Sequence, residues 1–424
     1  MEVSLGFHMV FAALGIGLPL LLLIAEAQWL RTGNAHYKEL ARQWAKATAL
    51  TFAVGAVSGT ALSFELGLLW PRFMETAGAT IGSAFTLEAY AFFTEAIFLG
   101  LYLYGWDRLS PRAHWLTAIP VALSGLASGV LVVAVNAWMQ HPFTTHPSGE
   151  LVLRTDPLAP FASPAWLTMA LHSSLACYVA TGFATAGVYA AGLLRGHRDA
   201  YHRSGLRIAM AVGGVAALLQ PLSGDISARS VARLQPIKLA AMESLFETRA
   251  NAPLTIGGIP DVEARVVRFG IEVPGALSFL AHHDPDAVVT GLADVPRELW
   301  PNVMITHLAF QIMVGCGMVM VVVALWYWWS DRQRRDLRAS LLRVLLAAAP
   351  LGFLALEAGW VVTEVGRQPW IIYQVMRTQD AVTSVQGISA TFIAFTILYA
   401  VLGIALLVLL QRLAYNRRVV TEQA

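Results

Sequence analysis

The feature that most constrains this chain is a series of nine apolar stretches, each long enough to cross a lipid bilayer as a helix. About 20 apolar residues span the hydrocarbon core, because a helix rises by about 1.5 Å per residue. Since only 13% of the 424 residues are charged, the sequence predicts an all-α, polytopic membrane protein. Pro221 and Gly224 interrupt the sixth stretch early. The stretches lie at roughly 5–30, 46–69, 83–106, 115–138, 164–194, 207–223, 302–329, 341–365 and 386–411.

Basic residues indicate how these helices are oriented, because cytoplasmic connections retain Lys and Arg. The predicted outer short connections hold only Arg72, Arg154, Arg367 and Arg377. The alternate connections and the C-terminal tail are much richer in basic residues, so we expect the N-terminus outside and the C-terminus in the cytoplasm. The predicted cytoplasmic set is Arg31, Lys38, Arg42, Lys46, Arg108, Arg112, Arg195, Arg198, Arg203, Arg207, Arg332, Arg334, Arg335, Arg338, Arg343, Arg412, Arg417 and Arg418.

One long polar segment, at about 224–300, separates the first six stretches from the last three. The predicted orientation places it outside, and a connection of this length is usually functional or disordered. Its stretch RLQPIKLAAMESLFET is typical of short amphipathic helices. The sequence therefore predicts six membrane helices in 1–223, an extracytoplasmic segment in 224–300, and three helices with a cytoplasmic tail in 301–424.

Ionisable side chains inside the spans are candidates for function, because a charge there costs several kcal/mol. In the predicted orientation, His172 and Met313 both lie about 12–16 Å below the outer end of their helices. Most of the other candidates also fall in the outer half of the membrane. The full set is His8, Glu26, Glu65, Glu88, Glu95, His172, His307, Met313, Glu357 and Glu364.

Histidine, methionine and carboxylates at one depth, without a set of cysteines, favour haem over zinc or an iron–sulfur cluster. A His and a Met make a six-coordinate, low-spin haem, whereas a single ligand leaves an iron that can bind oxygen. From the residues alone, a haem site and an ion pathway both remain open. A lone intramembrane His is more often a packing residue, and we expect His307 to be structural and Glu26 to extend its carboxylate toward the inner surface.

Six blocks of sequence resemble, in the same order, the large subunit of cytochrome bd-type quinol oxidases, and they extend over almost the whole chain. They are FHMVFAALGIGLPLLLLIAE at 7–26, GSAFTLEAYAFFTEAIFLGLYLYGWDRL at 82–109, VNAWMQHP at 135–142, KLAAMESLFET at 238–248, GIPD at 258–261 and EAGWVVTEVGRQPW at 357–370. The polar segment between the sixth and seventh spans lacks the C-terminal insertion of the family's long-loop members. In this respect the chain resembles the short-loop members.

The resemblance implies three haems. His172 and Met313 match the axial ligands of a low-spin haem b. His8 and Glu364 match the ligands of two high-spin haems, one b-type and one d-type, and which residue holds which haem stays open. Gln311 stands two positions before Met313, where many members of the family carry Arg.

The resemblance also implies roles for residues around the haems. Glu88 matches a carboxylate beside the oxygen-binding iron, and Ser128 matches a position of the family's proton pathway. Glu95 lies two turns deeper than Glu88 on the same face of its helix, so we expect it to relay protons to the iron site. Trp360 and Arg367 bracket Glu364, and an Arg beside haem is expected to pair with a propionate. For Ser128, a small residue at a helix contact is an equally good interpretation.

Lys238 and Glu243 match the outer residues through which the family engages quinol. A carboxylate can accept a hydroxyl proton, and an ammonium can stabilise the oxygen that becomes negative. Without the resemblance, a Lys and a Glu at this spacing are typical of a solvated surface.

The resemblance thus implies the haem-carrying subunit of a respiratory terminal oxidase in the bacterial inner membrane. It would oxidise ubiquinol or menaquinol at the outer face and reduce dioxygen to water, building a proton gradient without a pump. We expect a haem-free subunit II as partner, with a small single-span subunit as a further one. Two alternatives remain: a cyanide-insensitive relative with only b haems, and a haem b anchor that transfers electrons to or from quinone. A secondary transporter predicts repeat symmetry between the two halves, and we find none.

Overall fold

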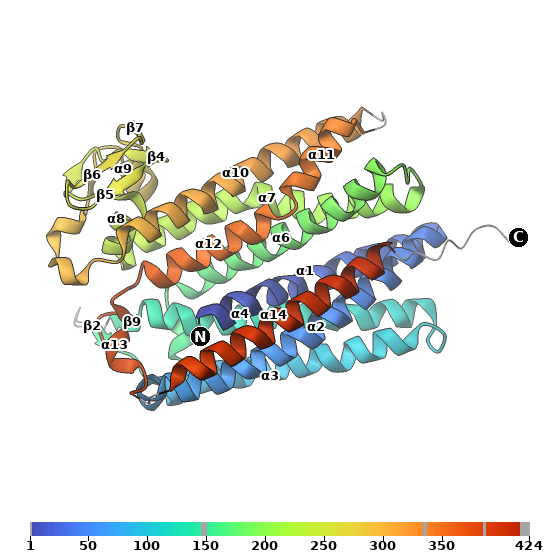
Figure 1. The fold of residues 1–424 in the computed structure, drawn as a ribbon, viewed down its shortest axis with the longest axis horizontal. Helices are drawn as coiled ribbons and strands as arrows, with labels where there is room; N and C mark the ends of the chain where they lie inside the picture. Colours follow the sequence, from blue (N-terminus) through green and yellow to red (C-terminus); the bar gives the residue numbers. More distant parts are fainter. Residues whose placement is uncertain (1, 146–150, 334–336, 385–386, 416–424) are drawn as a thin grey trace, which may run out of the picture.

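The computed structural model describes residues 2–145, 151–333, 337–384 and 387–415. Within these ranges nine helical spans are long and apolar enough to cross a membrane, which confirms the predicted number and the all-α class. They run side by side along the long axis of the molecule (Figure 1). The spans are α1 (Glu2–Thr32), α2 (Ala35–Leu69), α3 (Pro71–Gly105), α4 (Pro111–Gln140), α6 (Trp166–Leu194), α7 (Ala200–Leu234), α10 (Val303–Arg332), α11 (Ala339–Ala348) with α12 (Leu351–Val365), and α14 (Ile388–Tyr415).

Several helices are longer than the apolar stretches that predict them. The helix α3 begins at Pro71 rather than near residue 83, with proline in its first turn, where no backbone donor is needed. The helix α7 runs through Pro221 to Leu234, beyond the predicted end at residue 223. A membrane helix tolerates an internal proline because neighbouring groups satisfy the backbone that the ring leaves unbonded.

The eighth span is broken where the sequence predicts one continuous helix over 341–365. The helix α11 ends at Ala348 and α12 begins at Leu351, with Pro350 as its N-cap residue. Proline lacks a backbone N–H and its ring collides with the preceding turn, so the helix is interrupted there. The break lets α11 and α12 pack separately against α6.

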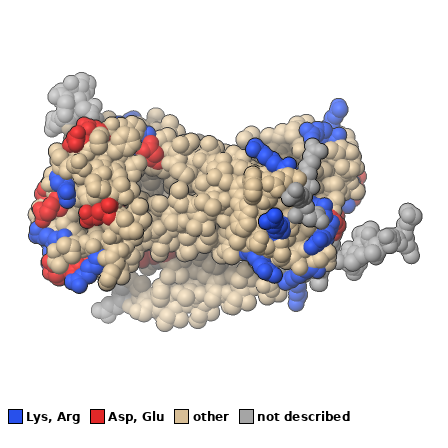
Figure 2. All heavy atoms as spheres, turned by 90° about the horizontal axis from the view of Figure 1, so that it is seen from above, with Lys and Arg blue, Asp and Glu red and all other residues tan. Residues whose placement is uncertain are grey.

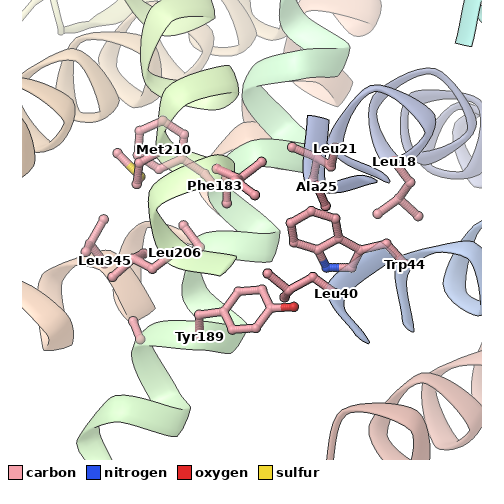
Figure 3. Packing of buried hydrophobic residues seen from close by; sticks show 14 of the residues in the cluster. Leu18, Leu21, Ala25, Leu40, Trp44, Phe183, Tyr189, Leu206, Met210 and Leu345 are labelled. Carbon is pink, nitrogen blue, oxygen red and sulfur yellow. The ribbon is translucent and has the colours of Figure 1, made fainter. Parts of the chain in front are cut away.

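The core of the bundle is formed where α1, α2, α6, α7 and α11 meet (Figure 3). The helices α6 and α7 approach most closely at two glycines, since a Cβ atom on Gly182 would lie 2.4 Å from the Cα of Gly213. Small residues allow membrane helices to pack at this distance. The labelled side chains are Leu18, Leu21, Ala25, Leu40, Trp44, Phe183, Tyr189, Leu206, Met210 and Leu345.

The polar segment after α7 is folded and caps one end of the bundle (Figure 1). It starts after Leu234 rather than at residue 224, because α7 continues through the first part of the predicted segment. A small core of its own includes Leu239, Leu277 and Leu292. Its elements are α8 (Pro236–Glu243), β3 (Arg249–Ala250), β4 (Leu254–Ile256), β5 (Ile259–Asp261), β6 (Val266–Arg268), β7 (Ile271–Val273), α9 (Ala276–His282), β8 (Val288–Val289) and the short 3-10 helices η1 (Leu292–Asp294) and η2 (Arg297–Leu299).

The strands of this cap form two-stranded antiparallel sheets, in which β3 pairs with β8, β4 with β7, and β5 with β6. Two further small hairpins lie near the same end, β1 (Phe143–Thr145) with β2 (Leu151–Leu153), and β9 (Trp370–Ile372) with β10 (Met376–Arg377). The remaining short helices are α5 (Ala159–Ala162) and α13 (Thr378–Ala381).

Charge is distributed unevenly along the molecule. Figure 2 shows a broad belt without charged side chains, a group of Lys and Arg at the end opposite the cap, and mixed charges at the capped end. The orientation stays a prediction, and this charge distribution is what it leads us to expect, with the cap outside. Arg334, Arg335, Arg417 and Arg418 of the predicted cytoplasmic set lie outside the described residues.

Candidate functional site

A chain of hydrogen bonds connects α4 to the end of α12. Asn136 donates to Glu364 Oε1 over 2.7 Å, and Arg367 donates to the other carboxylate oxygen of Glu364. Gln140, one turn after Asn136, donates to the Asn136 side-chain oxygen over 3.1 Å. Two neutral amides of α4 and one guanidinium of the α12 end therefore fix the Glu364 carboxylate.

The network continues to Lys238 on α8. The Lys238 ammonium donates to Gln140 Oε1 and, over 3.3 Å, to the backbone carbonyl of Thr363. The aliphatic part of the Lys238 side chain lies against Gly366, where a Cβ atom would come within 3.1 Å of Lys238 Cγ. Burial, and next the Arg367 charge, lower the pKa of Lys238 from 10.5 to about 7 against the opposing effect of Glu364. An amine with this pKa titrates near neutrality.

Glu243 ends α8 and is buried like Lys238. Within the part of the chain that the structure describes, its Oε2 atom has no hydrogen-bond partner. Burial raises the pKa of Glu243 from 4.5 to about 8. The structure thus places an amine and a carboxyl group on one buried eight-residue helix, both with pKa values near neutrality, whereas their spacing alone is typical of a solvated surface.

His172 lies on α6 and faces α7. Its Nδ1 atom is 2.9 Å from the Ser223 hydroxyl, and the Gln220 amide lies 3.2 Å from its Nε2 atom. A Cβ atom on Gly224 would be 3.6 Å from the imidazole, so the turn after Pro221 leaves room for the ring. Gly224, one of the two residues that predict a helix end, therefore lies beside the candidate ligand.

Met313 lies on α10 and faces α12. A Cβ atom on Gly359 would lie 2.9 Å from its sulfur, so the thioether packs directly on the α12 backbone. His172 and Met313 come from different helices, α6 and α10, and both of these helices pack against α7 and α12.

His8 lies on the first turns of α1, beside α2. Its Nδ1 atom is 2.9 Å from the Ser58 hydroxyl, and a Cβ atom on Gly59 would be 3.1 Å from the ring. The same part of α1 approaches α12, because a Cβ atom on Gly6 would lie 3.2 Å from Glu357 Oε2.

The predicted proton path is brought together in part. Ser128 of α4 donates to Glu88 Oε1 of α3 over 2.9 Å. Glu95 is buried two turns further along α3, and a Cβ atom on Gly125 of α4 would lie 3.3 Å from its carboxylate. Both carboxylates thus face α4 along the same helix contact.

Glu26 does not extend toward the inner surface, contrary to the sequence prediction. It is 0% exposed, and its Oε1 atom is 2.6 Å from His114 Nδ1. The other ring nitrogen of His114 is 2.8 Å from the backbone carbonyl of Tyr102. Since Glu26 faces α4 rather than the membrane surface, a buried pair replaces the expected solvated carboxylate.

The residues around Glu364 fit haem. Arg367 is only 4% exposed, and among the described residues its Nε and Nη1 atoms have no hydrogen-bond partner. A buried guanidinium with two unused donors suits a propionate. The indole N–H of Trp360 is also buried without a partner in the described ranges. No three His, Cys, Asp or Glu side chains of the described residues form a metal cluster, whereas haem requires one or two axial ligands.

Sequence reasoning missed the neutral partners of these groups, namely Ser58, Asn136, Gln140, Gln220 and Ser223, and also His114. Asn136 and Gln140 lie in the block VNAWMQHP, which carries the resemblance, but amides and hydroxyls within a span have no charge that singles them out.

In the described part of the chain, nine helical spans carry single His, Met and Glu side chains at separate positions, and a buried Arg has two donors without partners. These features fit an integral membrane protein that binds haem. The family model for cytochrome bd terminal oxidase subunit I matches residues 1–418. The chain belongs to this family.

Individual relatives agree with this assignment. The chain is 38% identical to the putative cytochrome bd menaquinol oxidase subunit I of Bacillus subtilis, over 96% of this chain and 93% of the relative. It is 32% identical to cytochrome bd ubiquinol oxidase subunit 1 of the same organism, over 95% and 89%. The solved structure of bd oxidase from Geobacillus thermodenitrificans is similar with a TM-score of 0.91 and 40% identity, over 98% of this chain and 96% of that one.

Membership confirms several predictions. The chain is subunit I of a cytochrome bd-type quinol oxidase, a multi-pass protein of the bacterial inner membrane, and the family carries haem and works with a subunit II. The alternatives of a transporter and of an anchor without oxygen chemistry are therefore wrong.

Proposed function

We propose that this chain oxidises quinol at its capped end and delivers the electrons to dioxygen through three haems. His172 and Met313 would hold a low-spin haem b, and His8 and Glu364 would hold two high-spin haems, one of b type and one of d type. When bound, the haems supply one-electron carriers and an iron that binds oxygen. The proposed complex includes a haem-free subunit II and a small single-span subunit.

The observation that supports this proposal most directly is the hydrogen-bonded chain from Lys238 through Gln140 and Asn136 to Glu364. It connects α8, the proposed quinol site, with the proposed ligand of a high-spin haem. Buried polar groups are costly unless they are bonded, so a continuous network of this kind fixes the relative position of the two sites.

Lys238 and Glu243 can divide the work of quinol oxidation. In its ionised form, Glu243 accepts one hydroxyl proton from quinol, and the Lys238 ammonium stabilises the oxygen that becomes negative. Once Glu243 has released that proton it can accept the second, and the two electrons would leave one at a time through the haem that His172 and Met313 would hold. Both groups lie on the cap, so the proton that Glu243 accepts can leave to the outer side in the predicted orientation.

Glu95, Ser128 and Glu88 can supply protons for oxygen reduction. The Ser128 hydroxyl holds the Glu88 carboxylate at 2.9 Å, and Glu95 lies two turns deeper on the same helix. If these protons enter from the cytoplasm while quinol protons leave outside, charge is separated across the membrane without a pump.

Difference spectra of the purified complex test this proposal. Reduced-minus-oxidised and CO-difference spectra would be compared for the wild type, His172→Ala, Glu364→Ala and Glu88→Ala, with Gln333→Ala as control, because Gln333 is exposed at the far end of α10. We expect His172→Ala to lose a low-spin haem b signal, and Glu364→Ala and Glu88→Ala to lose or change high-spin, CO-binding signals.

The same spectra separate the possible haem types. A far-red band is the sign of haem d, and its absence from the wild type would favour an oxidase with b haems alone. A low-spin signal that survives in His172→Ala would contradict the assignment of that ligand.

A further inference from the structure

Two side chains of α10, one turn apart, attach the cap to the bundle. The Gln311 side chain makes two bonds to the backbone, because its Nε2 atom donates to the Thr255 carbonyl over 2.9 Å and its Oε1 atom accepts from the Gly257 N–H over 2.9 Å. An amide can do this because it carries both a donor and an acceptor. The side chain therefore forms with the end of β4 the same kind of donor and acceptor pair that the backbone of a neighbouring strand would form.

His307 makes the second attachment. Its side chain is fully buried, and its Nδ1 atom lies 2.9 Å from the Met242 carbonyl. Its Nε2 atom lies 3.1 Å from the Gly257 carbonyl. Both partners are backbone carbonyls, which accept from whichever ring nitrogen carries a proton. The ring thus bridges α8 and the turn after β4.

These contacts lie between the two proposed sites of electron transfer. Met242 immediately precedes Glu243, the proposed base, and Gln311 stands two residues before Met313, the proposed haem ligand. Met242 also packs with Ala309 of α10 in one apolar cluster. A shift of the cap relative to α10 would therefore move the base relative to the haem ligand.

The turn at Gly257 and Gly258, which Gln311 and His307 of α10 contact, has a restricted backbone conformation. Gly257 has φ of +68° and Gly258 has φ of +89°, a backbone region that favours glycine. A Cβ atom on Gly258 would lie 2.5 Å from Val267 of β6. The turn is therefore set from one side by β6 and from the other by Gln311 and His307.

We propose that His307 and Gln311 act as a clamp that positions the quinol-binding cap, and Glu243 in particular, relative to the helix that carries Met313. This inference rests on the proposed function of Glu243 and Met313. His307 and Gln311 are positioning residues, since they bond to the backbone of the cap and act through it.

The identity of residue 311 follows from this role. Arg, which many members of the family carry here, has five donors and no acceptor, so it cannot accept from the Gly257 N–H. Gln311 satisfies both backbone groups and adds no charge. Gln311→Arg would therefore break half of the contact even though it restores a common residue.

Gln311 is the better position to vary, because its side chain is partly exposed whereas His307 is fully buried. The test compares Gln311→Leu, Gln311→Arg and Gln311→Glu with the wild-type complex. Gln333→Leu, a change at the exposed far end of the same helix, is the matched control. Quinol oxidation is measured as kcat and KM, haem content and CO binding by spectra, and the protection of the Gly257 amide by hydrogen exchange.

We expect Gln311→Leu to lower kcat/KM for quinol about tenfold, mainly through KM, as the loss of about one net hydrogen bond implies. The Gly257 amide should exchange about tenfold faster, because its acceptor is gone. Haem content and CO binding should stay at the wild-type level, which a general loss of structure would not allow. Gln311→Glu keeps the acceptor and should retain the protection of Gly257.

The outcomes separate the clamp from the proposed function. If the wild type oxidises quinol and Gln311→Leu has the same kcat/KM and the same Gly257 exchange, the clamp is refuted and the quinol site stands. A wild-type complex that carries haem but does not oxidise quinol refutes the proposed function itself.

Discussion

The pKa values of Lys238 and Glu243 imply a distinctive pH dependence of quinol oxidation. Lys238 loses its proton as the pH rises through about 7, and Glu243 loses its proton as the pH rises through about 8. The proposed reaction needs the charged form of both groups. The rate should therefore rise with the ionisation of Glu243 and fall with the neutralisation of Lys238.

The product of the two charged fractions gives the expected profile. It is largest midway between the two pKa values, at about pH 7.5, and is lower by about sixfold at pH 6 and at pH 9. The profile of kcat/KM reports the free enzyme, so it is the quantity to measure. Initial rates of oxygen consumption over pH 5.5–9.5, at several quinol concentrations and constant ionic strength, provide it.

Lys238→Arg is the decisive variant, because a guanidinium stays charged over the whole pH range. The alkaline decline should disappear, and kcat/KM should rise through about pH 8 to a plateau. Glu243→Gln should remove the rising limb and lower the rate by about 10²-fold or more, as the loss of a general base does. A flat wild-type profile between pH 6 and pH 9, or an alkaline decline that persists in Lys238→Arg, would refute the reasoning.

Three further changes have expected outcomes that follow from contacts in the bundle. His114→Phe leaves the Glu26 carboxylate buried without its partner and should cost about 3–5 kcal/mol of stability, measured by thermal unfolding. The double variant His114→Phe with Glu26→Met should recover most of this stability. Equal losses in the single and the double variant would contradict a buried pair. Gly359→Ala places a methyl group 2.9 Å from the Met313 sulfur, so the low-spin haem spectrum and its potential should shift. An unchanged spectrum would contradict close packing of the sulfur on α12 in the haem-loaded protein. Gly182→Ala should force α6 and α7 apart and lower the thermal midpoint with a cost of about 1–3 kcal/mol; a stable variant with wild-type spectra would show that the helices can shift at this contact.

The number of helices could be predicted from the sequence, because the bilayer imposes one length on every span. The ends of the helices could not be predicted in the same way. The segments 224–234 and 71–82 include polar and charged residues, so they extend α7 and α3 beyond the apolar stretches that the hydropathy pattern detects. Pro221 and Pro350 show the limit of local rules. Both are prolines within predicted spans, yet α7 continues through the first while the eighth span breaks at the second.

The candidate ligands were predicted because charged or soft side chains inside a membrane are few and costly. Glu26 shows where this reasoning fails. Its position near the inner end of α1 predicts a carboxylate that reaches the surface, but His114 of α4 meets it instead, 88 residues further along the chain. The pairing depends on how α1 and α4 pack, which no local pattern contains.

The residues that the sequence did not reveal share a physical role. Gln140 and Asn136 are neutral amides, as is Gln311, which the sequence marks only as a departure from the family's Arg, and each bonds at the same time to a donor and to an acceptor. A buried ammonium such as Lys238 needs acceptors, and a membrane protein cannot supply them as further charges without added cost. Amides that lie one or two turns from a predicted ligand or inside a matched block are therefore the positions where the missing partners of a buried charge should be sought.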